Sequence, residues 1–435
     1  MHTSDVLMAL YEQYLLYPHV STDSRSIIPG ATFFALQGPN FNGNVFAAQA
    51  LAKGAACAII DDAQYKQGES YILVDDALKA LQALANLHRR RLKIPIIAIT
   101  GSHGKTTTKE LTQAVLSQRY KSYATQGNLN NHIGVPLSLL AIHPSAEVAV
   151  IEMGANHVGE IAELCTIAMP THGLITNIGY VHLEGFGGFE GVIRGKGELY
   201  DYLLRHNGQV FINSLHAILN DMGQRFETPI YYPQQQDFYH CQLVEAVPYV
   251  VYKSENGQRV STQLLGEHHF HNIAVALCIA KYFGVDECKA NQAIQAYQPC
   301  NNCSQVIKKG SNTILLDAYN ANPEAVKGAI HAFQFIQAPH KVLILGDMNE
   351  LGEESARFHQ ELVALTTQAP YQEVILCGPH LEVSKAANPQ ALHFKKKDLE
   401  AYLKQRQFKD TAILIKGSRT LQLETLVACI NSTNN

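Results

Sequence analysis

Long apolar runs alternate with amphipathic segments through most of the chain. In the middle of the sequence, runs rich in Ile and Val, each bounded by turn residues, span 94–100, 147–154, 172–179 and 208–214. Continuous rather than alternating hydrophobicity is typical of strands covered on both faces, as in a parallel sheet. A helix with apolar positions at Leu111, Val115 and Leu116 is predicted after the first run. This part of the chain is therefore predicted to be an α/β domain.

The same rhythm occupies both ends of the chain. Towards the N-terminus, strands are predicted at 31–38 and 56–61, with a helix between them that ends at Gly54 and a further helix over 77–91. After Pro299, helical stretches such as 354–367 alternate with strand-like runs, which is typical of a doubly wound sheet. These runs span 312–320, 340–348, 373–378 and 411–418. The predicted fold class is α/β in three domains, with boundaries at 1–91, 92–299 and 300–435.

Length and composition agree with a multidomain globular protein. The 435 residues exceed one ordinary core, and 46% hydrophobic with 17% charged residues is typical of a well-packed chain. The net charge is −4 and the basic clusters are short, so binding to nucleic acid or to a membrane surface is not predicted. No apolar run reaches ~18 residues, so no membrane span is expected. The first 20 residues are predicted to form an amphipathic helix rather than a signal peptide.

The nine cysteines are scattered along the chain, several of them in apolar runs. This distribution favours buried thiols in a reducing cytoplasm. Cys300 and Cys303 form a C-x-x-C, but no second pair at similar spacing is available for a structural zinc. The pair also follows Pro299 in a turn-like segment, whereas a redox pair normally opens a helix. Neither metal nor redox function is predicted for it.

A phosphate-binding loop is predicted at the end of the first central strand. Residues 99–110 are ITGSHGKTTTKE, and the strict G-x-x-x-x-G-K-[ST] pattern would need glycine where Ile99 stands. Nevertheless a strand precedes the G-K-T triplet and a helix follows it, so loop amides and the helix dipole would face an anion. Lys105 would reach the β- and γ-phosphates, and Thr106 would coordinate magnesium. The loop indicates a nucleoside triphosphate site without specifying a reaction.

Further candidates follow neighbouring strands. Glu152 ends one apolar run and His182 follows the next, so both would emerge at the carboxyl edge of the sheet, where α/β proteins gather their sites. A carboxylate there could complete a magnesium shell with Thr106, and His182 is a candidate second ligand. Lys196 lies between two glycines with Glu198 close by, and sequence physics alone gives no reason for a lysine at that position.

Eight segments, in order, resemble the motif series of the Mur ligase family. They are TGSHGKTTTKE, GNLNNHIGVPLSLL, IEMGANHVGEI, NIGYVHLEGFG, KGELYDYL, DAYNANPEA, LGDMNELGEES and IKGSR. The resemblance extends from Thr22 to about Glu424, and the family's shortened G-x-x-G-K-T loop accounts for Ile99. The segments DAYNANP and LGDMNELG resemble the corresponding motifs of one family member. That member adds D-alanyl-D-alanine to a UDP-N-acetylmuramoyl-tripeptide in peptidoglycan precursor synthesis.

The resemblance implies both architecture and chemistry. It implies an N-terminal domain for the UDP-sugar, a central ATP-binding domain, and a C-terminal Rossmann-like domain that closes over the nucleotide and receives the amino substrate. It also implies that ATP, with two Mg²⁺ ions, phosphorylates the substrate carboxylate to an acyl phosphate, which the amine then attacks. The expected protein is a cytoplasmic ligase that acts as a monomer.

The resemblance further implies roles for individual residues. The magnesium ligands would be Thr106, Glu152, His182 and Lys196, the last as a carbamate. Lys105, His182 and Lys196 would be catalytic. The residues expected around the nucleotide are Gly101, Ser102, His103, Gly104, Lys105, Thr106, Thr107, Asn272, Asp317, Tyr319 and Asn320. Those expected around the sugar-peptide and the dipeptide are Ser24, Arg25, Asn128, Asn130, Asn131, Asn322, Lys416 and Arg419.

Two positions depart from the family pattern. His269 replaces the first Asn of the G-x-H-N-x-x-N segment, while Asn272 is kept. Cys303 replaces an arginine that contacts ATP phosphates, a charge-assisted contact that contributes roughly 1.5–3 kcal/mol. Either ATP binding is weakened, or Lys308 or Lys309 supplies the cation. If ATP binding is weakened by the missing arginine, a Cys303→Arg variant restores the contact and lowers the KM for ATP.

Two rival functions are weighed against this interpretation. One is another ligase of the same type, either the tripeptide-forming enzyme or a folylpolyglutamate synthetase; the former would carry a D-N-P-R-like arginine, which is absent. The other is a nucleotide-gated binding module that keeps the loop without ligase chemistry. The joint presence of Glu152, His182 and Lys196 argues against a binding module, because mere binding does not need a second metal.

Overall fold

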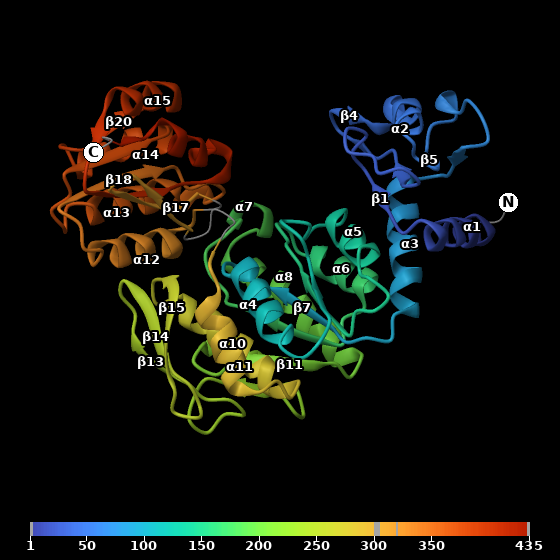
Figure 1. The fold of residues 1–435 in the computed structure, drawn as a ribbon, viewed down its shortest axis with the longest axis horizontal. Coiled ribbons are helices and arrows are strands. Elements are labelled where there is room, and N and C mark those ends of the chain that lie inside the picture. The colour runs from blue at the N-terminus through green and yellow to red at the C-terminus, as the bar shows by residue number, and fades with distance from the viewer. Residues whose placement is uncertain (1–2, 300–304, 319–320, 433–435) are drawn as a thin grey trace.

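The computed structural model describes residues 3–299, 305–318 and 321–432. Three α/β lobes follow one another along the chain (Figure 1), so the predicted fold class is confirmed. We use the predicted boundaries to name them the N-terminal lobe (3–91), the central lobe (92–299) and the C-terminal lobe (305–432). Among the described helices, none is long and apolar enough to cross a membrane.

The N-terminal lobe contains a four-stranded parallel sheet in the order β1-β2-β5-β6. Its helices and strands are α1 (Thr3–Leu16), β1 (Val20–Ser21), β2 (Thr32–Phe34), β3 (Gln37–Gly38), β4 (Phe41–Asn42), α2 (Ala47–Ala52), β5 (Cys57–Ile60), β6 (Tyr71–Leu73) and α3 (Ala77–Arg91). Phe33, Ala58 and Ile60 form a core with residues of α2. The lobe therefore buries an apolar cluster of its own, as its short apolar runs predict.

The central lobe is built on a six-stranded, fully parallel sheet in the order β12-β11-β10-β7-β9-β8. Its strands are β7 (Ile96–Thr100), β8 (Ser122–Ala124), β9 (Val148–Glu152), β10 (His172–Ile175), β11 (Gln209–Asn213) and β12 (Ile230–Tyr232). Its helices are α4 (Lys105–Leu116), α5 (Gly134–Leu140), α6 (Glu160–Ala168), α7 (Leu183–Phe186), α8 (Phe189–Arg205), α9 (Ala217–Gly223), α10 (His269–Tyr282) and α11 (Glu287–Ala296). Because β7 lies between β9 and β10, the strand order reverses there, which opens a crevice at their carboxyl ends.

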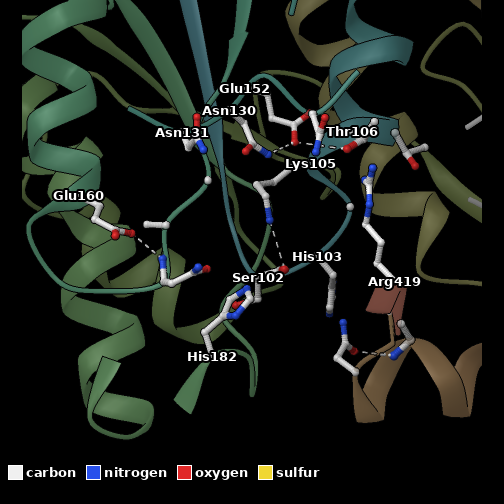
Figure 2. A pocket seen from close by; sticks show the side chains of 18 of the residues that line it. Ser102, His103, Lys105, Thr106, Asn130, Asn131, Glu152, Glu160, His182 and Arg419 are labelled. Carbon is white, nitrogen blue, oxygen red and sulfur yellow. Dashed lines mark hydrogen bonds between the residues drawn. The ribbon is translucent and has the colours of Figure 1, made fainter. Parts of the chain in front are cut away.

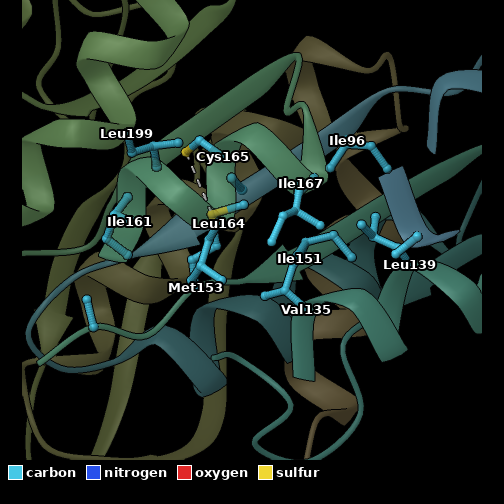
Figure 3. Close-up of a cluster of buried hydrophobic side chains, with 14 of the residues drawn as sticks. Ile96, Val135, Leu139, Ile151, Met153, Ile161, Leu164, Cys165, Ile167 and Leu199 are labelled. Carbon is cyan, nitrogen blue, oxygen red and sulfur yellow. Dashed lines mark hydrogen bonds between the residues drawn. The ribbon is translucent and has the colours of Figure 1, made fainter. Parts of the chain in front are cut away.

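Both faces of the central sheet are covered by helices, which explains the continuous apolar runs. On one face, Ile96 and Ile151 pack against Leu139 of α5 and Leu164 of α6 (Figure 3). On the other face, alternate residues such as Ile97 pack against α4 and α10. The side chains of each strand alternate between two buried environments.

A three-stranded antiparallel sheet, formed by β13 (Gln242–Glu245), β14 (Tyr249–Lys253) and β15 (Arg259–Leu265), was not predicted. In β15 exposed and buried residues alternate, because one face of this sheet remains open to solvent. Searching for continuous apolar runs misses such strands.

The C-terminal lobe contains a six-stranded sheet in the order β16-β17-β22-β18-β19-β20, parallel except for β16. The strands of this sheet are β16 (Gln305–Lys309), β17 (Asn312–Asp317), β18 (His340–Gly346), β19 (Glu373–Cys377), β20 (Leu392–Phe394) and β22 (Thr411–Lys416). Strands β21 (Gln407–Phe408) and β23 (Asn431–Ser432) pair with each other in a separate two-stranded sheet. The α-helices of the lobe are α12 (Pro323–Gln334), α13 (Ser355–Leu365), α14 (Pro379–Ser384) and α15 (Lys396–Gln405). The register places Asp317 beside Lys416 at the carboxyl edge.

Helix α3 fastens the N-terminal lobe to the central one. Its Arg89 is buried and donates Nε–H to the carbonyl of Ala168 at the end of α6, at 2.8 Å. Gln82, two turns earlier, donates to the carbonyl of His132 at 3.0 Å. The first contact satisfies a carbonyl at the C-terminal end of α6, and both contacts hold α3 against the central lobe.

Candidate active site

The predicted phosphate loop connects β7 to α4. Gly104 stands at the N-cap of α4 with a φ of 76°, and Lys105 is the first residue of the helix. A Cβ atom on Gly104 would lie 2.7 Å from Oδ1 of Asn272, so both the backbone angle and the close approach require glycine. Lys105 Nζ donates to the carbonyls of Gly101 and Ser102, at 2.7 and 3.3 Å. The loop thus brings a cation and a helix N-terminus to one place.

Residues that follow β10 hold this loop in shape. Gly179 donates its N–H to Ser102 Oγ at 2.8 Å, and His103 donates its N–H to Asn177 Oδ1 at 3.0 Å. Thr176 Oγ1 donates to the carbonyl of His103 at 2.6 Å. The loop is therefore preorganised by the neighbouring strand rather than by its own residues alone.

Glu152 ends β9 next to the loop and is only 1% exposed. Its Oε1 accepts hydrogen bonds from Thr106 Oγ1 at 3.3 Å and from Asn130 Nδ2 at 2.8 Å (Figure 2). The predicted metal-binding carboxylate and a predicted substrate residue are thus in direct contact. Thr106, at the start of α4, completes the group.

His182 and Lys196 lie further along the chain in the same region. His182 precedes α7 with a φ of 49°, and its Nδ1 contacts Oε2 of Glu350 from the C-terminal lobe. Burial lowers the pKa of His182 to about 4. Lys196, in α8, is 1% exposed; its Nζ donates to the carbonyl of Ala155 at 2.9 Å and lies 5.0 Å from the ring centroid of Phe186. Burial lowers the pKa of Lys196 well below its usual range, which favours the neutral amine.

A cavity of about 780 Å³ lies between the central and C-terminal lobes and brings most of the predicted residues together. The lining residues that the sequence predicted are Ser102, His103, Gly104, Lys105, Thr106, Thr107, Asn128, Asn130, Asn131, Glu152, His182, Asp317, Asn322, Lys416 and Arg419. Gly101, Lys196 and Asn272 do not line it, but each contacts a residue that does. The cavity therefore collects the loop, the carboxylate and the C-terminal residues.

The C-terminal lobe supplies charged groups to this cavity. Lys416, 2% exposed, forms an ion pair with Asp317 across neighbouring strands, with Nζ 2.7 Å from Oδ2. Asn322 caps α12 by accepting the N–H of Ala325 at 2.9 Å. Glu324, in the first turn of α12, contacts His103 in the phosphate loop: Oε2 of Glu324 lies 2.8 Å from Nε2 of His103. Charges of both signs from this lobe thus face the phosphate loop.

The segment after β15 forms another wall. His268 and His269 line the cavity with their ring centroids 4.1 Å apart, and Asn272 Nδ2 lies 3.3 Å from His269 Nδ1. Burial lowers the pKa of His268 to about 4. In the described part of the chain, no three His, Cys, Asp or Glu side chains are grouped so that they could hold a metal ion.

The structure places several predicted residues elsewhere. Ser24 and Arg25 belong to the N-terminal lobe: Ser24 Oγ donates to Gln49 Oε1 at 3.2 Å, and Arg25 pairs with Asp23 at 2.8 Å. They do not line the cavity.

Lys308 and Lys309 donate to Thr313 Oγ1 and to the carbonyl of Val427, at 2.7 and 2.9 Å. Neither lysine lines the cavity, so the structure gives no support to the idea that they supply the missing cation. Tyr319, Asn320, Cys300 and Cys303 lie outside the described residues.

Some residues that contact the site were not predicted, because they are far in sequence from the residues they contact. Glu324 and Glu350 contact predicted residues across the lobes, 221 and 168 residues away from His103 and His182. Glu160 lines the cavity and accepts the N–H of Asn156 at 2.6 Å. Glu160 and Glu324 each lie in the first turn of a helix, and no helix was predicted at either place.

Models of three Mur ligase domains match the chain: the "Mur ligase family, catalytic domain" over residues 17–89, the "Mur ligase middle domain" over 99–280, and the "Mur ligase, glutamate ligase domain" over 304–419. This chain belongs to the Mur ligase family. The family resemblance seen in the sequence is therefore confirmed, and the three matches follow the order of the three lobes.

Individual relatives cover almost the whole chain. A UDP-N-acetylmuramoyl-tripeptide–D-alanyl-D-alanine ligase of Bacillus subtilis is 33% identical over 96% of this chain and 93% of its own length. A crystal structure of MurF from Acinetobacter baumannii matches with a TM-score of 0.83 at 28% identity, covering 94% of this chain and 92% of that one. MurF from Thermotoga maritima in complex with ADP matches with a TM-score of 0.82 at 26% identity, covering 95% and 97%.

Proposed function

We propose that this chain is an ATP-dependent ligase that joins D-alanyl-D-alanine to UDP-N-acetylmuramoyl-tripeptide. The observation that carries the proposal is the cavity in which the phosphate loop and buried Glu152 face Lys416 and Arg419 of the C-terminal lobe. The names of the relatives support the substrates, and the ADP complex of the Thermotoga maritima structure supports ATP as the phosphoryl donor.

The residues present fit magnesium. Glu152 lines the cavity beside Thr106, and its Oε2, which lies 3.5 Å from the ammonium group of Lys109, receives no hydrogen bond within the described structure. Thr106, Glu152, His182 and a carbamate on Lys196 would hold two Mg²⁺ ions, which neutralise charge on the phosphates.

Lys196 fits carbamylation by its surroundings. A buried amine with a lowered pKa keeps a lone pair at Nζ, which can attack the carbon of carbon dioxide. The N–C bond forms, one N–H proton leaves to water, and the side chain becomes an anion. This change accounts for a lysine buried beside a cation site.

The chain's own groups then serve the two chemical steps. Lys105 and the amides of the loop stabilise the γ-phosphoryl group while its bond to ADP breaks and its bond to the tripeptide carboxylate forms. The amine of D-alanyl-D-alanine attacks the carbonyl carbon of this acyl phosphate and the C–N bond forms. The bond between that carbon and the bridging phosphate oxygen breaks, inorganic phosphate leaves, and the nitrogen loses one proton to solvent. Lys416 and Arg419 orient the anionic groups from the opposite wall. Closure of the C-terminal lobe excludes water, which would hydrolyse the acyl phosphate.

The test is a phosphate-release assay with the purified chain, ATP and Mg²⁺. We expect phosphate only when both the UDP-N-acetylmuramoyl-tripeptide and D-alanyl-D-alanine are present. Lysine- and diaminopimelate-containing tripeptides, compared in parallel, identify the third residue of the peptide. Rapid ATP hydrolysis without either substrate would contradict the proposal.

We further propose a cytoplasmic monomer. The cysteines of the described chain form no disulfide, and most are buried, which is typical of a reducing compartment. Light scattering coupled to gel filtration measures the mass in solution, and a dimer at micromolar concentration would contradict the monomer.

A further inference from the structure

Lys109 is a buried cation that lies behind the cavity rather than in it. It stands one turn after Lys105 on α4, is 2% exposed, and does not line the cavity. Burying an ammonium group is costly unless it is paired and hydrogen-bonded. Because it does not line the cavity, its effect on the site passes through the groups that it contacts.

Those neighbours belong to two different binding elements. Lys109 Nζ lies 3.5 Å from Oε2 of Glu152, the carboxylate proposed to hold magnesium. The same Nζ donates to the carbonyl of Gly127 at 3.2 Å, at the start of the loop proposed to touch the sugar-peptide. One ammonium group therefore joins the nucleotide side of the cavity to the substrate side.

A second connection between the same elements strengthens the link. Asn130, in the substrate loop, donates to the other oxygen of Glu152 at 2.8 Å, and its carbonyl accepts the N–H of Gly154 at 2.7 Å. The Glu152 carboxylate is thus held at both oxygens by groups that also define the loop 127–131. A change in position or charge distribution at Glu152 changes the forces on this loop directly.

We propose that Lys109 is a positioning residue that couples magnesium–nucleotide binding to binding of the UDP-sugar-peptide; this inference rests on the proposed function. When a cation shares the charge of Glu152, the attraction between Glu152 and Lys109 weakens, and the ammonium group strengthens its bond to the Gly127 carbonyl. The loop is then ordered for substrate. Since such coupling is reciprocal, bound substrate also raises the affinity for the nucleotide.

The test measures coupling by calorimetry rather than by activity. The affinity for UDP-N-acetylmuramoyl-tripeptide is measured with and without Mg²⁺ and adenylyl imidodiphosphate, an ATP analogue that does not transfer its phosphoryl group. In the wild type we expect the analogue to tighten substrate binding about fivefold or more. In Lys109→Met we expect the ratio of the two affinities to fall to about one, and in Lys109→Arg, which keeps a cation, to return towards the wild-type ratio.

Matched variants separate coupling from folding. Lys79→Met removes an exposed lysine, with 82% of its side chain accessible, and should leave the ratio unchanged. Circular dichroism and thermal melting show whether each variant folds. Should Lys109→Met not fold, Lys109→Gln takes its place, because it keeps a donor for Gly127 without the charge.

The outcomes distinguish this inference from the proposed function. A wild-type chain that binds neither ligand overturns both. A wild-type chain that binds both ligands without coupling, or a folded Lys109→Met variant that keeps the wild-type ratio, overturns the role of Lys109 alone. Loss of the ratio in Lys109→Met with its return in Lys109→Arg supports it.

Discussion

The carboxylate of Glu350 in the C-terminal lobe contacts Nδ1 of His182 in the central lobe. The contact is strengthened by the backbone, since Leu183 donates its N–H to the carbonyl of Glu350 at 3.2 Å. His182 is a proposed magnesium ligand, and in this structure Glu350 occupies its Nδ1. A Mg²⁺ ion bound at this same nitrogen would break a contact between the lobes.

Glu350→Gln is expected to lower the KM for Mg–ATP by about two- to fivefold, because a partly exposed hydrogen bond between a neutral imidazole and a carboxylate contributes roughly 0.5–1 kcal/mol. Steady-state kinetics at saturating concentrations of the other two substrates measure the change. Glu353→Gln, an exposed carboxylate in the same loop, serves as the control and should have no effect. A raised KM in Glu350→Gln would mean that this carboxylate assists the loaded state instead.

Lys196→Ala should reduce the rate of phosphate release by roughly 10²-fold or more, because an anion near the phosphates would be lost. A short carboxylic acid such as acetate should restore part of the rate by taking the place of the carbamate. Carbon-13 spectra of wild-type protein in labelled bicarbonate should show one carbamate signal that is absent from the variant. Rescue by a short amine rather than by an acid would contradict the carbamate.

Gly104→Ala should weaken nucleotide binding by more than about tenfold, since the new Cβ combines a left-handed backbone with the close approach to Asn272. Gly257, in the turn between β14 and β15, has a similar φ of 85° with no atom nearer than 3.8 Å. Gly257→Ala should therefore lower the free energy of unfolding by ~1–2 kcal/mol, as the same backbone strain does in Gly104→Ala, but should leave the nucleotide affinity unchanged. Fluorescent-nucleotide titration and urea unfolding measure the two effects. Equal nucleotide affinity in both variants would show that the approach to Asn272 is immaterial.

Acid should destabilise the fold through partly buried histidines such as His172, whose pKa burial lowers from 6.5 to about 4. Between these values the unfolded chain binds the proton and the folded chain does not, so stability falls as pH falls through this window, by at most roughly 3 kcal/mol for this residue. His172→Phe keeps an aromatic ring against Phe211 and Tyr282 and should flatten the decline.

Urea unfolding at pH 7 and at pH 5 measures this difference. Replacing His340, which is exposed at the start of β18, serves as the control and should leave the decline as in the wild type. A His172→Phe variant with the full wild-type decline would contradict the assignment.

The sequence was most informative where structure is local. The helix predicted to follow the phosphate loop begins at Lys105, and the helix predicted over 77–91 has those bounds, because each begins at a capping position, Gly104 or Asp76, that local sequence specifies. Glu152 and His182 line one cavity because carboxyl ends of parallel strands share an edge, which the order of strands and helices already implies.

The remaining parts depend on contacts that no local pattern encodes. Lys109 appears in the sequence as one more polar residue of an amphipathic helix, and only the position of β9 beside α4 buries it against Glu152. Glu324 and Glu350 reach their partners because the C-terminal lobe lies against the central one, which depends on the packing of whole lobes. The antiparallel sheet was missed because its strand β15 alternates between exposed and buried residues and its strands β13 and β14 are only four and five residues long.

Helix α3 has a consequence for which peptides can react. Because Arg89 and Gln82 fasten this helix to the central lobe, the N-terminal lobe with Ser24 and Arg25 stands at a set distance from the phosphate loop. Helix α3 thus fixes the distance between the proposed binding place of the UDP group and the place of phosphoryl transfer. With the UDP group held at Ser24 and Arg25, a peptide one residue too short would leave its carboxylate short of Lys105, and the distance between the two lobes would select the length of the acceptor.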